Sequence, residues 1–429
     1  MKRSERKAIF FTFPIGQSIR DHLHLGTLRI LRALLPDVEI IGLSPSYFDE
    51  RFRRWCAEVG VIPEKKLNPV SAGVNARLVR LRKRLRSARL RRWMVQWEAR
   101  RYTVPGYLEE LFMTYRPRLV VLTHPMTTHD YEVYMGAIRY GVPTLGIVNS
   151  WDNLRKGLTQ WADRISVWNR INYEEALRMN AYAAHQVRIN GPVSFDPFFD
   201  PGWEDTREET ARKLGLDPSR RWITYATSGV FHMGYYGRDE TWLVHEIMRW
   251  RAEHAALRDT QLLVRLHPMS KLEYFMPLKK QYPDVVFSYG GYLPGTGWIT
   301  DREDYRLQVN ILRHSDVVIT PGSSWTIEAA VMDTPVVVPV YSTIQPEHAR
   351  EQFDNFTLAA HFRPIVQAGW VPVTRTSEAT LTALLEALEA PEATKSGRRA
   401  LVDAYVPFRD GKSAERVARW IYEHYRAWT

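Results

Sequence analysis

Two polar motifs follow strand-like apolar runs in the second half of the chain. The first run, "DVVIT", is followed by "PGSSWTIEAA", which places Ser323 and Ser324 at the start of a predicted helix. Free backbone N–H groups and hydroxyls at a helix start favour an anion, so a phosphate fits there. Glu328, one turn further in, is placed to accept hydrogen bonds from sugar hydroxyls. The alternative is that one serine only caps the helix.

The second motif, "LVRLHPMSK", ends another strand-like run with Arg265 and His267. Pro268 stops the strand, and charge-assisted hydrogen bonds from Arg and His side chains hold phosphates well. A single His is more often structural, but this one shares its half of the chain with the Ser-Ser turn, which favours a phosphate ligand. The loop over 226–240 adds Ser228 and several glycines that would let the backbone approach a ligand, unless it is simply a flexible connection.

A reaction at a sugar or other hydroxyl would also need a proton acceptor, and loops of the first half supply carboxylates and imidazoles. The loop "NSWDNLRKG" follows an apolar run and contributes Trp151, Asp152, Asn153 and Lys156. Such a polar group after a buried strand favours function, with a local Asx turn as the alternative. A carboxylate beside a tryptophan can be partly desolvated and made more basic, so Asp152 is the first candidate for a catalytic base. Asp21 and His124, each after a neighbouring strand, are the reserves.

Apolar runs of strand length alternate with helical patterns along the 429 residues, which predicts an α/β fold with parallel sheets. At this length and 45% hydrophobic content, two domains are expected. The Pro-, Asp- and Gly-rich stretch "SFDPFFDPGWEDTREET" suits the crossing between them. We therefore predict an N-terminal Rossmann-like domain, a C-terminal Rossmann-like domain, and a helix packing near their junction, over residues 1–200, 201–410 and 411–429.

The expected secondary structure follows from these runs. Strands are predicted at 7–13, 38–44, 118–124, 143–150, 164–169 and 186–192, and then at 221–228, 261–268, 284–290, 316–322 and 335–341. Helices are predicted at 18–34, at 131–140, and from a capping Ser413 to the end of the chain.

The formal net charge of +11 favours anionic partners. Residues 77–101 read as a basic amphipathic helix, which predicts either an anionic membrane surface or an ordinary solvated face. Nucleic acid is not favoured, because no other segment resembles a nucleic-acid module. Without an expected membrane span or signal peptide, and with Cys56 as the single cysteine, we predict a cytoplasmic protein that can lie on the inner face of the cell membrane.

The motifs together resemble a known group of enzymes. The second half is similar to the nucleotide-binding domain of GT-B glycosyltransferases, in which two doubly wound domains face a central cleft. His267-Pro268 with Ser323-Ser324 resembles the His-Pro and Ser-Ser motifs of bacterial polysialyltransferases and teichoic-acid glycerophosphotransferases. The resemblance implies that the His and Ser groups hold the phosphate of a cytidine-activated donor, and that Glu328 meets its ribose. It also implies that the N-terminal domain binds the acceptor and the C-terminal domain the nucleotide donor.

The resemblance also bears on mechanism. Many retaining GT-B enzymes carry a Glu eight positions before the ribose-binding Glu, and Thr320 stands there, which favours inversion. We expect a glycosyltransferase that moves a sugar from a nucleotide-activated donor, CMP or CDP rather than UDP, to a surface glycan or lipid-linked acceptor, without metal or other cofactor. The alternatives are a CDP-alcohol glycerophosphotransferase-like enzyme, a UDP-sugar 2-epimerase, and a silent polysaccharide-binding subunit. The last is disfavoured by the intact candidate residues.

Overall fold

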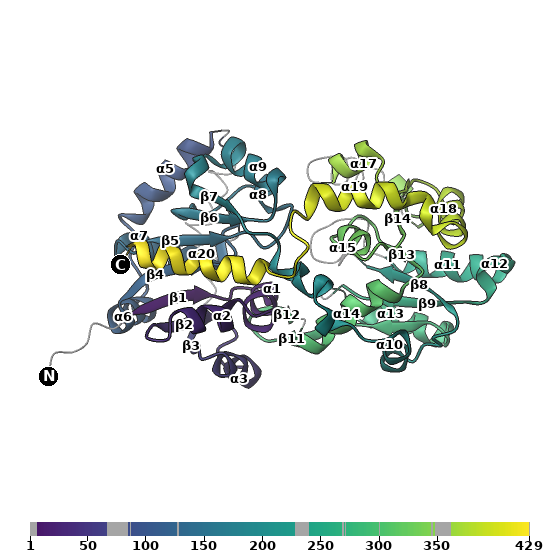
Figure 1. Cartoon of the computed structure of the whole chain (residues 1–429), viewed down its shortest axis with the longest axis horizontal. Coiled ribbons are helices and arrows are strands. Elements are labelled where there is room, and N and C mark those ends of the chain that lie inside the picture. The colour runs from purple at the N-terminus through teal and green to yellow at the C-terminus, as the bar shows by residue number, and fades with distance from the viewer. Residues whose placement is uncertain are drawn as a thin grey trace. The chain divides into compact units, whose positions relative to one another are not determined.

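The chain folds into two compact α/β units. The computed structural model describes residues 7–66, 85, 87–126, 128–227, 240–267, 270, 272–299, 301–344, 346–347 and 362–428. The first unit comprises Met1–Asp196, Tyr292–Ile299 and Tyr405–Thr429, and the second comprises Pro197–Gly291 and Thr300–Ala404. Each unit holds its own parallel sheet covered by helices (Figure 1). The predicted α/β class with two Rossmann-like doubly wound domains is confirmed.

The sheet of the first unit has seven parallel strands in the order β3-β2-β1-β4-β5-β6-β7. Its strands are β1 (Ala8–Thr12), β2 (Glu39–Ser44), β3 (Ile62–Lys65), β4 (Pro117–Leu122), β5 (Thr144–Ile147), β6 (Arg164–Val167) and β7 (Val187–Ile189). The central strands are continuous apolar runs because helices bury both of their faces. All six strands predicted for this half are present, and β3 is additional.

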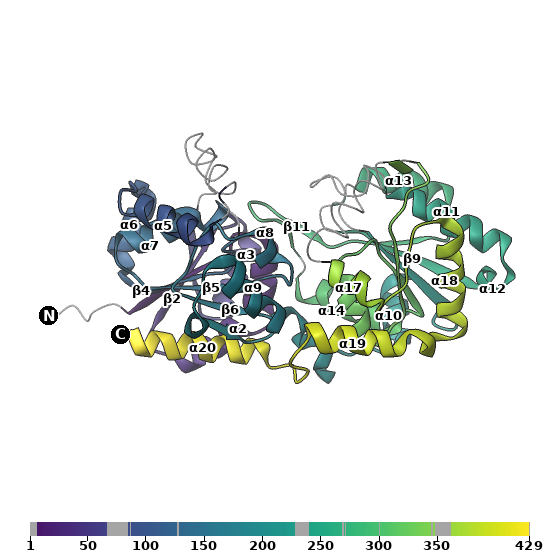
Figure 2. The same ribbon diagram turned by 90° about the horizontal axis from the view of Figure 1, so that it is seen from above.

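The helices of the first unit lie on both faces of this sheet. They include α1 (Gly16–Ile19), a π-helix (Arg20–His24), α2 (Thr27–Leu34), α3 (Glu50–Glu58), α5 (Ala88–Ala99), α6 (Gly106–Tyr115), α7 (Tyr131–Arg139), α8 (Asn153–Lys156), α9 (Arg170–Asn180) and α20 (Ser413–Trp428). Figure 2 shows α20 beside α2 on one face and α5, α6 and α7 on the other. The predicted single helix over 18–34 was wrong, because Gly26, at φ 97°, separates the π-helix from α2.

The sheet of the second unit has six parallel strands in the order β10-β9-β8-β13-β14-β15. Its strands are β8 (Arg221–Ala226), β9 (Thr260–Arg265), β10 (Val286–Ser288), β13 (Val317–Ile319), β14 (Val336–Pro339) and β15 (Val373–Thr374). The helices around it include α10 (Arg207–Leu214), α11 (Thr241–Glu253), α12 (Ala255–Arg258), α13 (Leu272–Gln281), α14 (Arg302–His314), α15 (Trp325–Val331), α17 (Arg363–Ala368), α18 (Ser377–Glu389) and α19 (Lys395–Tyr405). The five strands predicted here are present, and the short edge strand β15 is additional.

The start of α20 is held by a residue far away in the sequence. The carboxylate of Asp196 accepts hydrogen bonds from the backbone N–H groups of Ser413 and Ala414, at 2.8 and 2.7 Å. The predicted cap at Ser413 was therefore wrong, because Asp196 satisfies these two helix-start donors and Ser413 is already the first residue of the helix. Burial raises the pKa of Asp196 to about 6, although these donors favour its charged form.

A short hairpin completes the first unit. Its strands β11 (Gly291–Leu293) and β12 (Gly297–Ile299) are joined by a turn that packs on the loop after β2. The Ser46 hydroxyl donates to the carbonyl of Pro294 at 2.6 Å. Across the described part of the chain, none of the helices is both long and apolar enough to cross a membrane.

Candidate functional site

The motifs of the second unit meet at one edge of its sheet. Strands β9, β8 and β13 are neighbours and run parallel, so their carboxyl ends share that edge. Neighbouring strands lie about 4.8 Å apart, which puts the His-Pro and Ser-Ser motifs about two strand spacings from each other. This is the edge at which open α/β sheets bind ligands.

His267 is fixed through its backbone at this edge. Its N–H donates to the Thr227 hydroxyl at 2.7 Å, and that hydroxyl also lies 3.1 Å from the Ser270 hydroxyl. Burial lowers the pKa of His267 to about 4, so the imidazole is neutral at neutral pH. A neutral imidazole can donate one hydrogen bond to a phosphate oxygen. Sequence reasoning missed Thr227, although it is the first residue after an apolar strand.

Arg265 lies in a buried ion pair. Its guanidinium donates to both carboxylate oxygens of Asp304 in α14, at 2.8 and 2.7 Å, and to the Ser288 hydroxyl at 2.8 Å. A phosphate on Arg265 would have to compete with a bidentate carboxylate. Asp304 does not follow a predicted strand, so the sequence did not identify it as the partner of Arg265.

The two serines differ in their surroundings. The Ser323 hydroxyl accepts from the N–H of Trp325 at 3.2 Å and lies 2.8 Å from the hydroxyl of Thr320, as the capping alternative expected. Ser324 is half-buried at the N-cap position of α15, and its side chain makes no capping hydrogen bond there. Gly322, at φ 79°, makes the turn that precedes both. Of the two, the Ser324 hydroxyl is the better placed to bind a ligand.

Glu328 is held inside the first turn of α15. Its side chain is buried, and Oε2 accepts a hydrogen bond from Nε2 of Gln308 in α14 at 2.9 Å. Gln308 thereby orients the carboxylate that the sequence assigns to the ribose. The last candidate of this unit, Ser228, lies outside the described residues, as does most of the loop over 226–240.

The loop that carries Asp152 follows β5 in the first unit. Asp152 is half-buried and precedes α8, and its Oδ1 accepts from the Ser150 hydroxyl at 2.6 Å and, weakly, from the amide of Asn153 at 3.5 Å. The ring of Trp151 lies edge-on to Tyr405, with centroids 5.5 Å apart. The carboxylate is thus oriented by its own loop next to a packed aromatic residue.

Helix α9 anchors this loop. Asn172 donates to the carbonyl of Trp151 at 2.7 Å, and Arg155 donates to Glu175 at 2.5 Å. Burial raises the pKa of Glu175, and the charge of Asp152 adds to the shift. Asn172 and Glu175 were missed because their partners are about 20 residues away. The backbone of Lys156 ends α8, and its side chain lies outside the described part of the chain.

The reserve residues are deeply placed in the first unit. Asp21 is 4% exposed, and Oδ1 accepts from Nε of its neighbour Arg20 at 2.6 Å. His124 is 9% exposed at the end of β4. Neither is as accessible as Asp152, which remains the first candidate for a base.

Together, the two Rossmann-like units, each with its own parallel sheet, have the architecture of the GT-B fold. The family description that matches is CDP-glycerol:poly(glycerophosphate) glycerophosphotransferase, over residues 195–423, slightly more than half of the chain. The chain belongs to this family. No curated protein sequence matches the chain.

Solved structures with the same fold cover nearly all of both chains. The wall teichoic acid polymerase TagF is 11% identical, with a TM-score of 0.58, covering 99% of this chain and 90% of TagF. The UDP complex of MnaA from S. aureus is 14% identical, with a TM-score of 0.57, covering 98% and 96%. The UDP-GlcNAc 2-epimerase of Neisseria meningitidis, bound to UDP-GlcNAc, is 11% identical, with a TM-score of 0.57, covering 97% and 100%. At these identities the likeness shows the fold.

Proposed function

We propose that this protein transfers an activated group from a cytidine-type nucleotide donor to a hydroxyl of a surface glycan or a lipid-linked acceptor. The observation that carries the proposal is the strand edge of the second unit, where His267, Ser324 and Glu328 lie within the region that matches the family. The family description names CDP-glycerol, which makes glycerophosphate the first choice for the transferred group. Recognition would divide between the phosphates, at His267 and Ser324, and the ribose, at Glu328.

The proposed step conserves atoms and charge. The acceptor oxygen attacks the phosphorus that bears glycerol, the bond from that phosphorus to CMP breaks, and CMP leaves with the electron pair. Asp152 takes the proton of the acceptor hydroxyl, as a general base does. If the transferred group is a sugar, the same attack falls on its anomeric carbon and inverts the configuration there.

We propose that the step needs no resident metal. The leaving phosphate would accept hydrogen bonds from the imidazole of His267, the hydroxyl of Ser324 and the first turn of α15, which are preorganised donors. Transfer should accordingly continue in EDTA at the rate seen without it. Loss of transfer in EDTA, restored by added Mg²⁺, would contradict this part of the proposal.

A thermal-shift panel of CMP, CDP, UDP, GDP and TDP tests the donor assignment. We expect CMP and CDP to raise the melting temperature most, and Ser324→Ala to weaken the shift, since a lost hydrogen bond to a charged group costs about 1.5–3 kcal/mol. Ser396→Ala, at an exposed position of α19, is the matched control and should keep the full shift. Equal shifts of the melting temperature in both variants would show that Ser324 does not bind the phosphate.

Incubation with CDP-glycerol and a hydroxyl acceptor tests the reaction. CMP should be released together with an acceptor enlarged by one glycerophosphate, as measured by mass spectrometry. A 2-epimerase would instead convert UDP-GlcNAc without any acceptor. If UDP-GlcNAc were converted and no CMP were released, the protein would be an epimerase and the proposed transfer would be rejected.

A further inference from the structure

The outward face of α5 is apolar, although it points to solvent. Leu90, Trp93 and Trp97 are 44%, 59% and 50% exposed. Their spacing of three and four residues places them on one side of the helix. Val95 and Ala99, on the opposite side, are buried in the core of the first unit. A helix on the surface of a globular protein normally carries its polar residues on the outside, so this pattern is unusual.

The arginines of this segment form two groups. Arg91 and Arg92 donate to the carbonyls of Met179 and Ala181, at 3.4 and 3.2 Å, and hold α5 on the end of α9. Arg89, Arg100 and Arg101 are exposed beside the apolar residues, and the Arg101 guanidinium lies 4.3 Å from the centre of the Trp97 ring. The outer face is therefore both aromatic and cationic.

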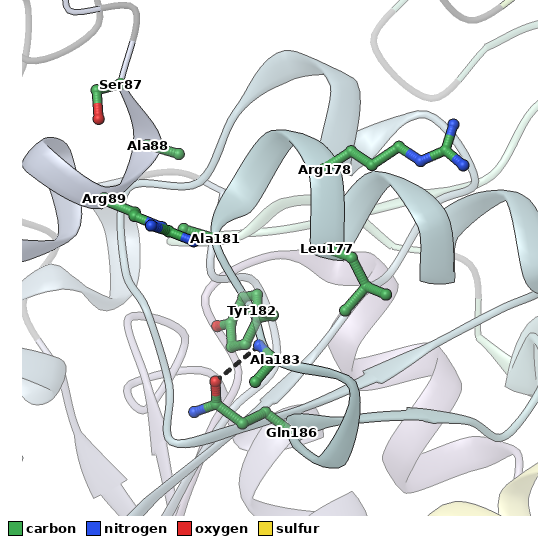
Figure 3. A pocket seen from close by; sticks show the side chains of 9 residues that line it. All are labelled: Ser87, Ala88, Arg89, Leu177, Arg178, Ala181, Tyr182, Ala183 and Gln186. Atoms are coloured by element: carbon green, nitrogen blue, oxygen red, sulfur yellow. Dashed lines mark hydrogen bonds between the residues drawn. The ribbon is translucent and has the colours of Figure 1, made fainter.

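A cavity of about 500 Å³ opens where the first turn of α5 meets the end of α9 (Figure 3). It is lined by Ser87, Ala88, Arg89, Leu177, Arg178, Ala181, Tyr182, Ala183 and Gln186. The Arg89 side chain points from α5 toward Ala181, whereas the Arg178 side chain points away from the other lining residues, and these nine residues include no carboxylate. The Arg178 side chain is 79% exposed, and its Nε lies 3.3 Å from a carboxylate oxygen of Glu174. The cavity can therefore take a phosphate beside the guanidinium group of Arg89, with Arg178 adding positive charge near its rim.

We propose that α5 docks on an anionic phospholipid bilayer. Leu90, Trp93 and Trp97 enter the interfacial layer, and a lipid headgroup phosphate binds in the cavity beside Arg89, with Arg178 near its rim. Tryptophan and arginine on one exposed helix face suit a membrane interface, where rings sit at the level of the headgroups and cations meet anionic lipid. Residues 77–84 and 86 of the predicted basic helix lie outside the described residues, and the proposal does not use them.

The proposal deepens the proposed function on one point, since a lipid-linked acceptor lies in a membrane. Its test measures vesicle binding without turnover, so its failure would leave the transfer reaction untouched. Conversely, an inactive protein that still binds vesicles would reject the proposed function alone.

Sedimentation with vesicles is the experiment. The full chain should bind phosphatidylcholine vesicles that contain phosphatidylglycerol, and bind pure phosphatidylcholine vesicles weakly. Binding to the anionic vesicles should fall as salt rises from low to physiological concentration, because salt screens the attraction. Equal binding to both vesicle types, or none to either, would overturn the proposal.

Paired variants separate the cavity from general charge. Arg89→Gln with Arg178→Gln should weaken binding about fivefold per arginine, and so on the order of 25-fold together. Arg54→Gln with Arg419→Gln removes the same charge from side chains that are 67% and 59% exposed, and should weaken binding far less. Equal losses in the two pairs would mean that the cavity is not a headgroup site.

Trp93→Ala with Trp97→Ala tests the apolar part. These side chains are exposed, so the variant should fold with an unchanged melting temperature and lose most of the vesicle binding that survives high salt. Unchanged binding at high salt would overturn the insertion of the helix face. A gel-shift with single-stranded DNA tests the alternative that this face binds nucleic acid. A complex tighter than that with vesicles, and lost in the Arg89→Gln and Arg178→Gln protein, would identify a nucleic-acid surface instead.

Discussion

His267 is a neutral group before the donor binds. Because burial lowers its pKa to about 4, the free protein holds an uncharged imidazole through the physiological range. A bound phosphate favours the imidazolium and raises this pKa, so donor binding should take up a proton. Because the folded protein keeps this imidazole neutral, the unfolded chain binds its proton at a higher pH. The contribution to the free energy of unfolding is therefore full above about pH 6.5 and is lost as the pH falls through about 4, so measurements belong above pH 5.

The first prediction follows from this linkage. Affinity for CDP-glycerol should increase as the pH is lowered from about 8 to about 5.5, because the bound state holds the extra proton. Calorimetry in buffers with different ionisation enthalpies would measure the proton uptake directly. His267→Gln should bind more weakly and show no proton uptake. If the affinity of the variant and of the parent depended on pH in the same way, His267 would not be a phosphate ligand.

The second prediction concerns Asp152. Asp152→Asn should lower turnover roughly 10²- to 10⁴-fold while the dissociation constant of the donor stays nearly the same, as expected for loss of a general base. Ser150→Ala keeps the carboxylate but removes its 2.6 Å hydrogen bond, so a smaller loss is expected. Asp37→Asn, at an exposed position, is the control. If Asp152→Asn turned over at the rate of the parent, the role would pass to His124 or Asp21.

Among the elements, the hairpin turn depends on a glycine. Gly295 has φ +91°, and a Cβ there would lie 2.4 Å from the carbonyl oxygen of Pro45. Gly297 has φ +81°, but a Cβ there meets nothing within 4 Å. Both substitutions carry the left-handed strain of about 1–2 kcal/mol, whereas Gly295→Ala must also displace the hairpin from the loop after β2.

The third prediction compares these two variants. Gly295→Ala should lower the melting temperature by several degrees more than Gly297→Ala does, since about 1 kcal/mol shifts it by about 2–4 °C in units of this size. Hydrogen exchange should quicken over 292–299 in Gly295→Ala only. Equal melting temperatures and equal exchange rates in the two alanine variants would show that the contact with Pro45 does not contribute to stability.

The elements also show which parts of the structure can be predicted from sequence. Central strands such as β1 and β13 are continuous apolar runs, so the pattern of residues alone predicts them. Strand β3, "IPEK", was missed because an edge strand is partly exposed and polar, and its pairing comes from tertiary context. The long-range contacts at Asp196 and Asp304 were missed for a similar reason. Local spacing identifies strand-end loops, but the partner that holds each side chain comes from another part of the fold.

On the scale of the whole molecule, each unit has its own hydrophobic core. If the units unfold independently, calorimetry should resolve two transitions. Asp196→Ala should lower only the transition of the first unit, by about 1–2 kcal/mol, because α20 loses its cap there. CDP should raise only the other transition, since a ligand stabilises the unit that binds it. A single transition that responds to both changes would contradict this fourth prediction.

The first unit is built from segments that lie far apart in the sequence, and this has a consequence for its synthesis. Helix α20 buries Val417, Trp420, Ile421 and Tyr425 and packs on α2, so the first unit needs residues that are synthesised after the whole of the second unit. The second unit is complete by Ala404. The growing chain therefore completes the second unit before the first, and the apolar surface beneath α20 stays uncovered until α20 has been synthesised. Chaperones that bind nascent chains should therefore bind the first unit, and emergence of α20 from the ribosome should be the event that covers their site.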